Sequence, residues 1–269
     1  MSALFEYRSD QIYCHHSLDE RPEADRFQIH VHETPEVYCF VSGSGSFLVE
    51  GTNYPLCPGD ILLMRPAETH RLIISPSEPY ERIAVHFPLS LFDSLDPGRT
   101  LMTPFLNRPL GVRNRYPALD HPALFPLLSH LSPNRLQIIS HLMQLLTELS
   151  SIRGAEEPVP DPAGDLPQQL VAYVNAHLFE EMSLPAIGDS LHRSVSQICR
   201  VFRRATGTSL WEYVVIKRLL AARELLRHGD SAVNAAFACG FSDYSSFYRA
   251  YVRRFGRAPG SDKAGRGSR

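Results

Sequence analysis

The sequence predicts a two-domain α+β protein, with an N-terminal antiparallel β-barrel followed by a few helices and a C-terminal domain made only of helices. Three observations support this division. Between residues 27 and 87, short apolar runs alternate with turn residues, as in small all-β barrels or sandwiches. After residue 120 the apolar spacing becomes helical, and a segment rich in proline and acidic residues divides the helices into two groups.

The composition predicts a globular chain without membrane segments or disulfide bonds. Apolar residues make up 43% and charged residues 21% of the 269 residues, which argues against intrinsic disorder. No apolar run is long enough for a membrane span and the N-terminus lacks a signal-peptide pattern, so we expect a cytoplasmic protein with no membrane partner. The five cysteines are scattered and form no CxxC pair, which argues against a disulfide framework or a zinc ribbon.

Charge divides the chain into an acidic body and a basic terminal third. Residues 1–183 carry 12 arginines, no lysine and 23 acidic residues, a balance of −11. Residues 184–269 carry 15 basic and 6 acidic residues, a balance of +9. A basic domain on an acidic body indicates a polyanionic partner such as nucleic acid, although a solvated basic face would have the same composition.

The first domain is expected to be a barrel over residues 1–119, followed by a helical segment over 120–153. The barrel strands are predicted in runs such as EVYCFV, DILLM and ERIAVHF, which turn residues separate. The second helix of the segment has an apolar stripe that can either pair two subunits, which we expect, or pack on its own barrel. The stripe consists of Leu136, Ile139, Leu142, Met143, Leu146 and Leu149.

The rest of the chain is predicted to be a linker, a helical domain and a tail. Residues 154–165 contain proline and acidic side chains with nothing large to bury, so they are predicted to be a linker. The second domain is expected over residues 166–260, and residues 261–269 are expected to be a disordered tail.

Capping residues mark the helices of the second domain. Ser183 and Ser194 are suited to cap two short helices, and Ser209 with Glu212 forms an S-x-x-E capping box. The box opens a helix that runs to about His228, on the order of 28 Å at ~1.5 Å per residue. This helix is a plausible rigid spacer.

An internal repeat is the most informative feature of the second domain. Five residues of one segment recur 49 positions later with the same spacing. They are Ser196, Arg200, Phe202, Arg204 and Gly207 in the first copy, and Ser245, Arg249, Tyr251, Arg253 and Gly256 in the second. In each copy a short helix precedes a turn and an amphipathic helix, which is the helix-turn-helix pattern.

The outer face of each second helix suits DNA. With its apolar positions in the core, the first copy directs Ser196, Arg200 and Arg203 outward and places Arg204 on the flank. The second copy directs Ser245 and Arg249 outward, with Arg253 on the flank. Small residues allow close approach to base edges, arginine pairs with guanine, and flanking arginines bind phosphates. Basic outer faces are common on helix pairs, but their repetition in register favours a double-stranded DNA partner.

The C-terminal domain resembles the AraC/XylS-type bacterial transcription regulators. The matching residues span nearly all of 166–260 and include Arg218, Gly240-Phe241-Ser242-Asp243, Phe255-Gly256 and Pro259. The resemblance implies an effector-controlled, dimeric regulator that contacts RNA polymerase if it activates transcription. It also implies base contacts from Ser196, Cys199 and Arg200 in the first unit and from Tyr244, Ser245 and Arg249 in the second.

The N-terminal domain resembles a cupin barrel, the sensory domain that many such regulators carry. The motif residues are His30, His32, Glu36, Gly43, Pro58-Gly59-Asp60, Pro66 and His70. Strand alternation places His30 and His32 on one face. With Glu36 and His70 they form a set that binds a metal in cupin enzymes. The alternatives are a metal site and a metal-free pocket for a small organic effector. We favour the second, with a sugar or related metabolite as the effector class that the resemblance implies, and expect no cofactor.

The rival hypothesis is a metal-dependent cupin enzyme with a helical appendage. The chain contains no GxGxxG, P-loop, GxSxG or HExxH motif. A repeated basic outer face would have no purpose in such an enzyme, so the sequence favours a regulator without enzymatic activity.

Overall fold

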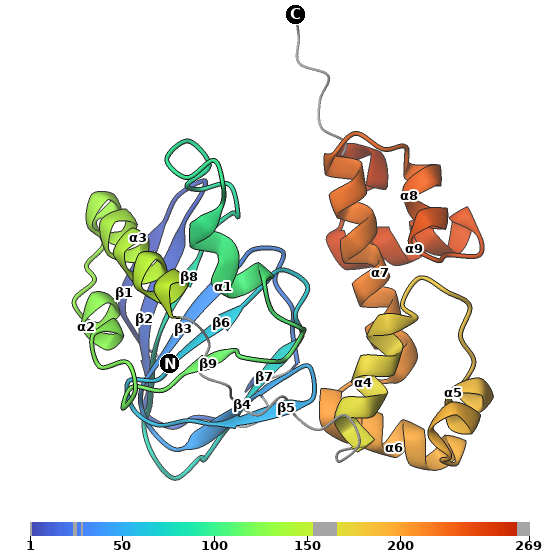
Figure 1. The fold of residues 1–269 in the computed structure, drawn as a ribbon, viewed down its shortest axis with the longest axis horizontal. Helices are drawn as coiled ribbons and strands as arrows, with labels where there is room; N and C mark the ends of the chain where they lie inside the picture. The colour runs from blue at the N-terminus through green and yellow to red at the C-terminus, as the bar shows by residue number, and fades with distance from the viewer. Residues whose placement is uncertain (1, 24–25, 28, 153–165, 263–269) are drawn as a thin grey trace, which may run out of the picture. The chain divides into compact units, whose positions relative to one another are not determined.

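The computed structural model describes the chain except for residues 1, 24–25, 28, 153–165 and 263–269 (Figure 1). The chain divides into two compact units, Met1–Asp161 and Pro162–Arg269. The described strands all lie in unit 1, and the described part of unit 2 is helical. The predicted linker 154–165 lies outside the described residues, and the boundaries at 119 and 153 stay predictions. In the described part of the chain, no helix is both long enough and apolar enough to cross a membrane.

The strands of unit 1 form two antiparallel sheets rather than one closed ring. The larger sheet contains, in spatial order, β1 (Ser2–Arg8), β2 (Tyr13–Asp19), β8 (Tyr80–His86), β3 (Glu36–Ser42), β6 (Ile61–Met64) and β9 (Arg115–Tyr116). The smaller sheet contains β5 (Thr52–Pro55), β4 (Gly45–Val49) and β7 (His70–Ile74). The predicted antiparallel β-domain is therefore confirmed.

Central strands β3 and β6 are buried on both faces. On β3, Cys39 faces a core shared with the helices, whereas Tyr38 and Phe40 face the core between the two sheets. On β6, Leu63 and Leu62 divide in the same way. The larger sheet is therefore a middle layer, and this two-sided burial explains why both strands read as continuous apolar runs.

Helices α1 (Thr103–Leu106), α2 (Leu124–Ser129) and α3 (Arg135–Ser151) contribute to the core on the outer side of that sheet. The face that α3 buries differs from the predicted stripe. Its buried residues are Ile138, Leu142, Leu145, Leu146 and Leu149.

Three members of the predicted stripe lie off that buried face. Leu136 is 78% exposed, Met143 is 38% exposed, and Ile139 is half-buried. The buried face of α3 packs on its own sheet, so Leu142, Leu146 and Leu149 follow the alternative of packing within the domain. Pairing of two subunits stays a prediction. Apolar residues occur around more than half of this helix, and spacing alone does not select the buried face.

Unit 2 is built from six α-helices in its described part. They are α4 (Leu166–Ala176), α5 (Leu184–Leu191), α6 (Val195–Thr206), α7 (Leu210–Arg227), α8 (Ala232–Ala238) and α9 (Tyr244–Phe255). One core surrounds Phe202 and the first helices, and another surrounds Phe247 and the last ones. Helix α7 contributes residues to both cores, which makes it the shared spacer that the sequence predicted.

The predicted caps are present with one difference. Hydroxyls of Ser183, Ser194 and Ser209 each accept a backbone hydrogen bond at the start of a helix. Glu212 does not close the second half of the capping box. Its Oε2 instead accepts a hydrogen bond from the hydroxyl of Thr208 at 2.7 Å.

The folded domain continues beyond residue 260, where the disordered tail was predicted to begin. Ser261 and Asp262 lie in a short 3₁₀ helix, η3 (Pro259–Asp262), so the boundary at 261 is wrong. The carboxylate of Asp262 accepts a hydrogen bond from the Tyr251 hydroxyl at 2.7 Å and pairs with Arg223 of α7 at 3.1 Å. These contacts fasten the end of the domain to α7 and α9. A lone aspartate in a polar terminus carries no sequence signal for such a role.

Replacing the carboxylate of Asp262 tests whether its contacts with Tyr251 and Arg223 stabilise the domain. Burial would raise the pKa of Asp262, but Tyr251 and Arg223 lower it below its ordinary value. The ion pair therefore adds stability above the unfolded pKa of ~3.9 and loses it as pH falls through the lower folded value. We expect Asp262→Asn to cost about 3 kcal/mol at pH 7 and much less at low pH, as measured by thermal unfolding of the full chain. Asp230→Asn, at an exposed site, is the control; equal losses in both variants would contradict the assignment.

Candidate ligand site and nucleic-acid interface

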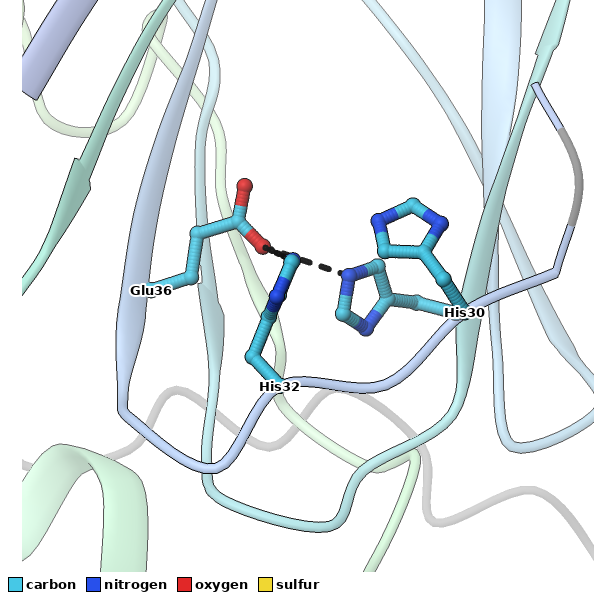
Figure 2. Close-up of side chains that lie close together, drawn as sticks. His30, His32 and Glu36 are labelled. Atoms are coloured by element: carbon cyan, nitrogen blue, oxygen red, sulfur yellow. Dashed lines mark ion pairs between the residues drawn. The ribbon is translucent and has the colours of Figure 1, made fainter. Parts of the chain in front are cut away.

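Four polar residues of unit 1 come together as the sequence analysis grouped them. His30, His32, Glu36 and His70 each offer one ligand atom, and these atoms lie within 4.8 Å of one another (Figure 2). Backbone hydrogen bonds of 3.0 Å in both directions hold His30 beside His70, the first residue of β7. Glu36 begins β3, on the face that looks toward the smaller sheet. We call these four residues the cage.

Glu36 carries the negative charge of the cage. Its Oε2 lies 3.2 Å from Nε2 of His70 and 3.3 Å from Nε2 of His32, as ion pairs rather than aligned hydrogen bonds. Burial would raise the pKa of Glu36, but the two imidazoles more than offset burial and the pKa lies well below its ordinary value. Burial also acts to lower the pKa of His70, but Glu36 raises it above the ordinary value.

A backbone contact fixes the orientation of His70. Its Nδ1 lies 2.9 Å from the carbonyl oxygen of Glu68. A carbonyl oxygen only accepts, so Nδ1 carries a proton and donates. Nε2 is thereby directed at Glu36.

His86, which the sequence motif does not include, is a fourth imidazole beside the cage. It lies opposite Glu36 in the β3–β8 pairing, with 3.9 Å between its Nε2 and Oε1 of Glu36. Its ring centroid is 4.5 Å from that of His32. Burial lowers the pKa of His86 to about 4. Alternation in β8 predicts that His86 and Val85 lie on opposite faces of the strand. The sequence contains no signal for the strand pairing that brings His86 to Glu36.

The cage extends along β2 and β8. His15 lies on the same face as His86, and burial followed by the charge of Arg82 lowers the pKa of His15 to about 4. Arg82 itself lies over the ring of Tyr80 at 5.3 Å. This inner face therefore offers imidazoles, a carboxylate and a guanidinium to a bound molecule.

The cage residues could hold a metal ion only after contraction. Four ligands at ~2.1 Å from a tetrahedral metal lie about 3.4 Å apart, whereas the cage atoms spread to 4.8 Å. A metal would also have to displace a proton from any protonated imidazole. An organic molecule with hydroxyl or carboxyl groups needs no such contraction.

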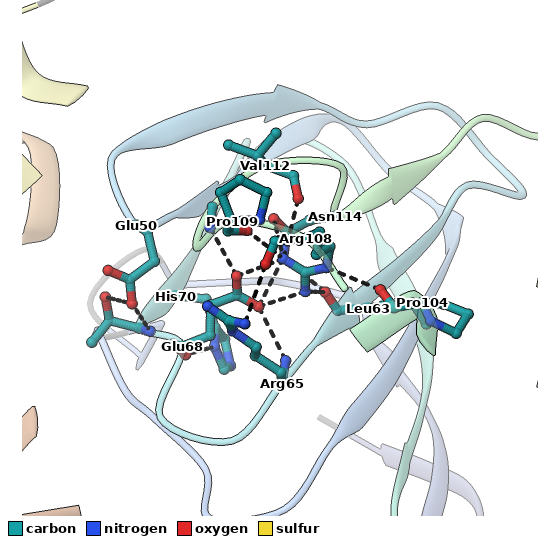
Figure 3. Close-up of polar contacts among 12 residues, drawn as sticks. Glu50, Leu63, Arg65, Glu68, His70, Pro104, Arg108, Pro109, Val112 and Asn114 are labelled. Carbon is teal, nitrogen blue, oxygen red and sulfur yellow. Dashed lines mark hydrogen bonds and ion pairs between the residues drawn. The ribbon is translucent and has the colours of Figure 1, made fainter. Parts of the chain in front are cut away.

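A buried polar network around Glu68 contacts the cage residue His70 (Figure 3). Arg108 forms two 2.7 Å contacts with the carboxylate of Glu68, whose backbone carbonyl orients His70. Asn114 donates to the same carboxylate at 3.0 Å and to the carbonyl of Leu63 at 2.7 Å. The loop that presents His70 is therefore fixed to the segment after α1.

In unit 2, α6 and α9, called here the recognition helices, expose most of the predicted residues. On α6, the outer residues Ser196, Cys199, Arg200, Arg203 and Arg204 are all exposed. Ile198 and Phe202 are fully buried on its opposite face. The helix ends at Gly207, whose φ of 76° is in the left-handed region.

Helix α9 repeats this arrangement with two differences. Ser245, Arg249 and Arg253 are exposed, whereas Tyr244 is only half-exposed, with its ring 5.8 Å from that of Phe247. Tyr248, which sequence analysis missed, is 41% exposed. Its position, three residues after Ser245, places it on the same helical face and could have signalled it.

Arg218 of α7 links the two helix-turn-helix units. Its Nε donates to the carbonyl of Leu178 at 2.7 Å and its Nη2 to that of Glu180 at 2.7 Å, in the loop before α5. Its Nη1 donates to the carbonyl of Gly240, in the turn between α8 and α9. A Cβ at Gly240 would lie 2.6 Å from the Phe179 carbonyl oxygen, so only glycine fits this junction. Sequence analysis found Arg218 without assigning this role.

Two sequence models of known families match the chain in succession. A model of the AraC-like ligand binding domain matches residues 17–146, and a model of a helix-turn-helix domain matches residues 187–264. The chain belongs to the AraC-type transcription regulators. This AraC-type protein is a DNA-binding transcription regulator controlled by a small effector, and it is not an enzyme.

This AraC-type regulator is similar to individual relatives along nearly its whole length. It is 26% identical to the HTH-type transcriptional activator RhaS of Escherichia fergusonii over 269 residues, with 93% of this chain and 92% of that protein covered. Against RhaS of Escherichia coli the identity is 26% over 266 residues, with 91% and 90% covered.

Solved structures also match this AraC-type chain. The DNA-binding domain of AdpA, in complex with a target DNA, is 26% identical and covers 35% of this chain and 85% of its own, with a TM-score of 0.33. ToxT of Vibrio cholerae is 13% identical and covers 94% and 97%, with a TM-score of 0.37.

The three bonds of Arg218 predict a spacing effect on DNA. Lysine at this position keeps the charge, but one ammonium cannot reproduce the planar fork that reaches three carbonyls. We expect Arg218→Lys to weaken binding to a duplex with two recognition elements one turn apart by about tenfold or more, because the two units are no longer held in one arrangement.

Fluorescence anisotropy on three duplexes tests this. The second duplex has the elements shifted by half a turn, and the third has one element. Arg227→Lys, on the exposed side of the same helix, is the control. Equal losses on all three duplexes, with an unchanged melting temperature, would show that Arg218 does not set the spacing.

Proposed function

We propose that this AraC-type regulator reads DNA with α6 and α9 and binds its effector at the cage. One observation carries the proposal: two capped, equivalent helices with basic outer faces lie at the ends of one spacer helix. Helix α7 has 18 residues, on the order of 27 Å at ~1.5 Å per residue, which is near the ~34 Å of one duplex turn. Both recognition helices can therefore enter successive major grooves.

Within each recognition helix the exposed residues have separate roles. Arg200 and Arg249 lie at the centres of the outer faces and pair with guanine edges, beside the small Ser196 and Ser245. Cys199, Arg203 and Tyr244 extend these base-contacting faces. Arg204 and Arg253 lie in the last turns, on the flanks, and contact phosphates.

The effector is a small polar metabolite, with a sugar or a related compound as the first class to test. The support is chemical: the cage and the adjoining face of β2 and β8 offer both donors and acceptors, which suits a molecule with several hydroxyl groups. His30 is exposed and His32 is half-buried, so the cage is accessible from solvent.

The regulator acts as a homodimer in the cytoplasm, where its DNA is, and contacts RNA polymerase when it activates transcription. Only part of α3 is left to pair subunits, because its buried face is occupied by the sheet. Leu136, Ile139 and Met143 form the remaining apolar patch, which is the proposed contact.

Arginine substitutions test the reading of DNA. Arg200→Ala should relax base preference in one element and Arg249→Ala in the other, each at about 1–3 kcal/mol, because each removes a bidentate base contact. Arg204→Ala and Arg253→Ala should weaken all sequences alike and reduce the salt dependence. A base-substitution scan with footprinting is the measurement, and Arg135→Ala in unit 1 is the control. If Arg249→Ala leaves the footprint and every base preference unchanged, α9 does not read DNA.

The double variant His32→Ala with His70→Ala tests the cage. We expect it to lose the effector response, because it removes two of the groups that surround Glu36, while binding to operator DNA persists. A thermal-shift screen of metabolites on wild type identifies the probe, and the same titration is then made on the variant. A full response in the double variant would place the effector elsewhere.

A substitution on the exposed side of α3 tests the dimer. Leu142 is 1% exposed, so a charge there would unfold unit 1 rather than test association. Met143→Glu should convert a dimer to a monomer in sedimentation at micromolar concentration, because it places a charge in the apolar patch. The same mass for wild type and variant would contradict pairing through this face.

A further inference from the structure

Unit 1 contains a cavity that includes no residue of the cage. It has a volume of about 260 Å³ and lies between α1, β9 and the last turn of α3. Sites for drug-sized ligands are typically ~300–1,000 Å³, so this one suits a smaller molecule. Its lining combines guanidinium groups, two rings and aliphatic side chains.

Arg113 contributes to this lining from a strained backbone. Its φ is +56°, in the left-handed region that side chains other than glycine rarely adopt. Buried hydrogen bonds hold the chain on both sides. The amide of Gly111 donates to Glu68 at 2.8 Å, and Asn114 is fixed through Leu63 and Glu68. The conformation of Arg113 is therefore imposed by its surroundings, a pattern that is associated with functional positions.

The charge of Arg113 is the least compensated of the three arginines that line the cavity. Arg108 is neutralised by Glu68, and Arg115 donates to the Pro55 carbonyl at 2.5 Å and lies 3.9 Å from Asp60. Among the described residues, Arg113 has no ion pair.

Two buried donors at this cavity lack an acceptor. The Nε atoms of Arg113 and Arg115 are both buried, and neither has a hydrogen-bond partner within the described structure. Buried donors are rarely left in this state in folded proteins, which points to a bound acceptor. Both side chains line the cavity, so an anion bound there lies beside both guanidinium groups.

The rest of the lining is suited to a compact organic body. Tyr116 and His121 present rings with centroids 5.9 Å apart, and Leu149 and Ile152 supply aliphatic surface at the end of α3. Asp120, also in the lining, disfavours a molecule with a second negative group near it.

We infer that this cavity binds a small aromatic carboxylate. Its carboxylate accepts hydrogen bonds from Arg113 and Arg115, and its body lies against Tyr116 and Ile152. The site is separate from the cage and would bind such an acid whether or not the cage binds the effector. A ligand here joins β9 to the last turn of α3.

Calorimetric titration of the full chain tests the inference, with phenylacetate as the probe. We expect binding that is about tenfold or more tighter than for phenylacetamide, the neutral isostere, and for inorganic phosphate, which lacks an apolar body. No binding of phenylacetate at millimolar concentration, or equal binding of the acid and the amide, would overturn the proposal. Phosphate binding as tightly as phenylacetate would show a general anion site and would also overturn it.

Variants place the ligand. Arg113→Asn removes the guanidinium and keeps a residue that tolerates a positive φ, so it should fold and lose about tenfold or more in affinity. Arg135→Asn, at the other end of α3, should bind as wild type does. Unchanged affinity in Arg113→Asn would overturn the assignment. The double variant His32→Ala with His70→Ala should keep its affinity for phenylacetate, and a loss there would assign the acid to the cage instead.

Discussion

The ion pair between Glu68 and Arg108 is the contact on which both the cage and the cavity lining of unit 1 depend. The side chain of Glu68 is fully buried, and burial would raise its pKa, but Arg108 holds it below the ordinary value. Through its backbone carbonyl Glu68 orients His70, and through its carboxylate it holds Gly111 and Asn114. Removing one partner alone would leave an unpaired buried charge, which costs about 3–5 kcal/mol. The pair therefore secures both the orientation of His70 in the cage and the segment that lines the cavity.

Local chemistry made the helical unit predictable. Caps such as Ser194 and glycines that end a helix, such as Gly207, act within one helical turn. The ends of these helices can therefore be located from the sequence alone. The cage was predictable only as a group, from the residue types and spacing of its motif. The strand expected through His30 and His32 is reduced to an isolated bridge at His30. His86 was not predictable, since it reaches Glu36 through the pairing of strands that are far apart in the sequence. The buried face of α3 also could not be chosen, because apolar residues surround most of that helix.

The recognition helices depend on a second long-range contact. Each helix-turn-helix unit has its own core, so packing within a unit does not fix the angle between units. The shared helix α7 fixes the distance between them, and Arg218 ties the loop before α5 to the turn before α9. An arginine suits this role because its planar guanidinium donates in several fixed directions. One side chain can therefore bond three backbone carbonyls. In the proposed recognition of two elements, the arrangement of the two units thus depends on a side chain outside the proposed base-contacting faces.

A continuous series of hydrogen bonds leads from the cage to the helices of unit 1. His70 donates to the Glu68 backbone, the Glu68 carboxylate binds Arg108, and Arg108 donates to the Pro104 carbonyl in α1 at 3.1 Å. A ligand that contacts His70 at Nε2 leaves the bond from Nδ1 in place, whereas a ligand that rotates the ring breaks it. The series is thus either intact or interrupted at its first bond. A ligand shifts such an equilibrium only by the difference in its affinity for the two states. If the effector binds at the cage as proposed, that difference lies in how it contacts the His70 ring in its two orientations.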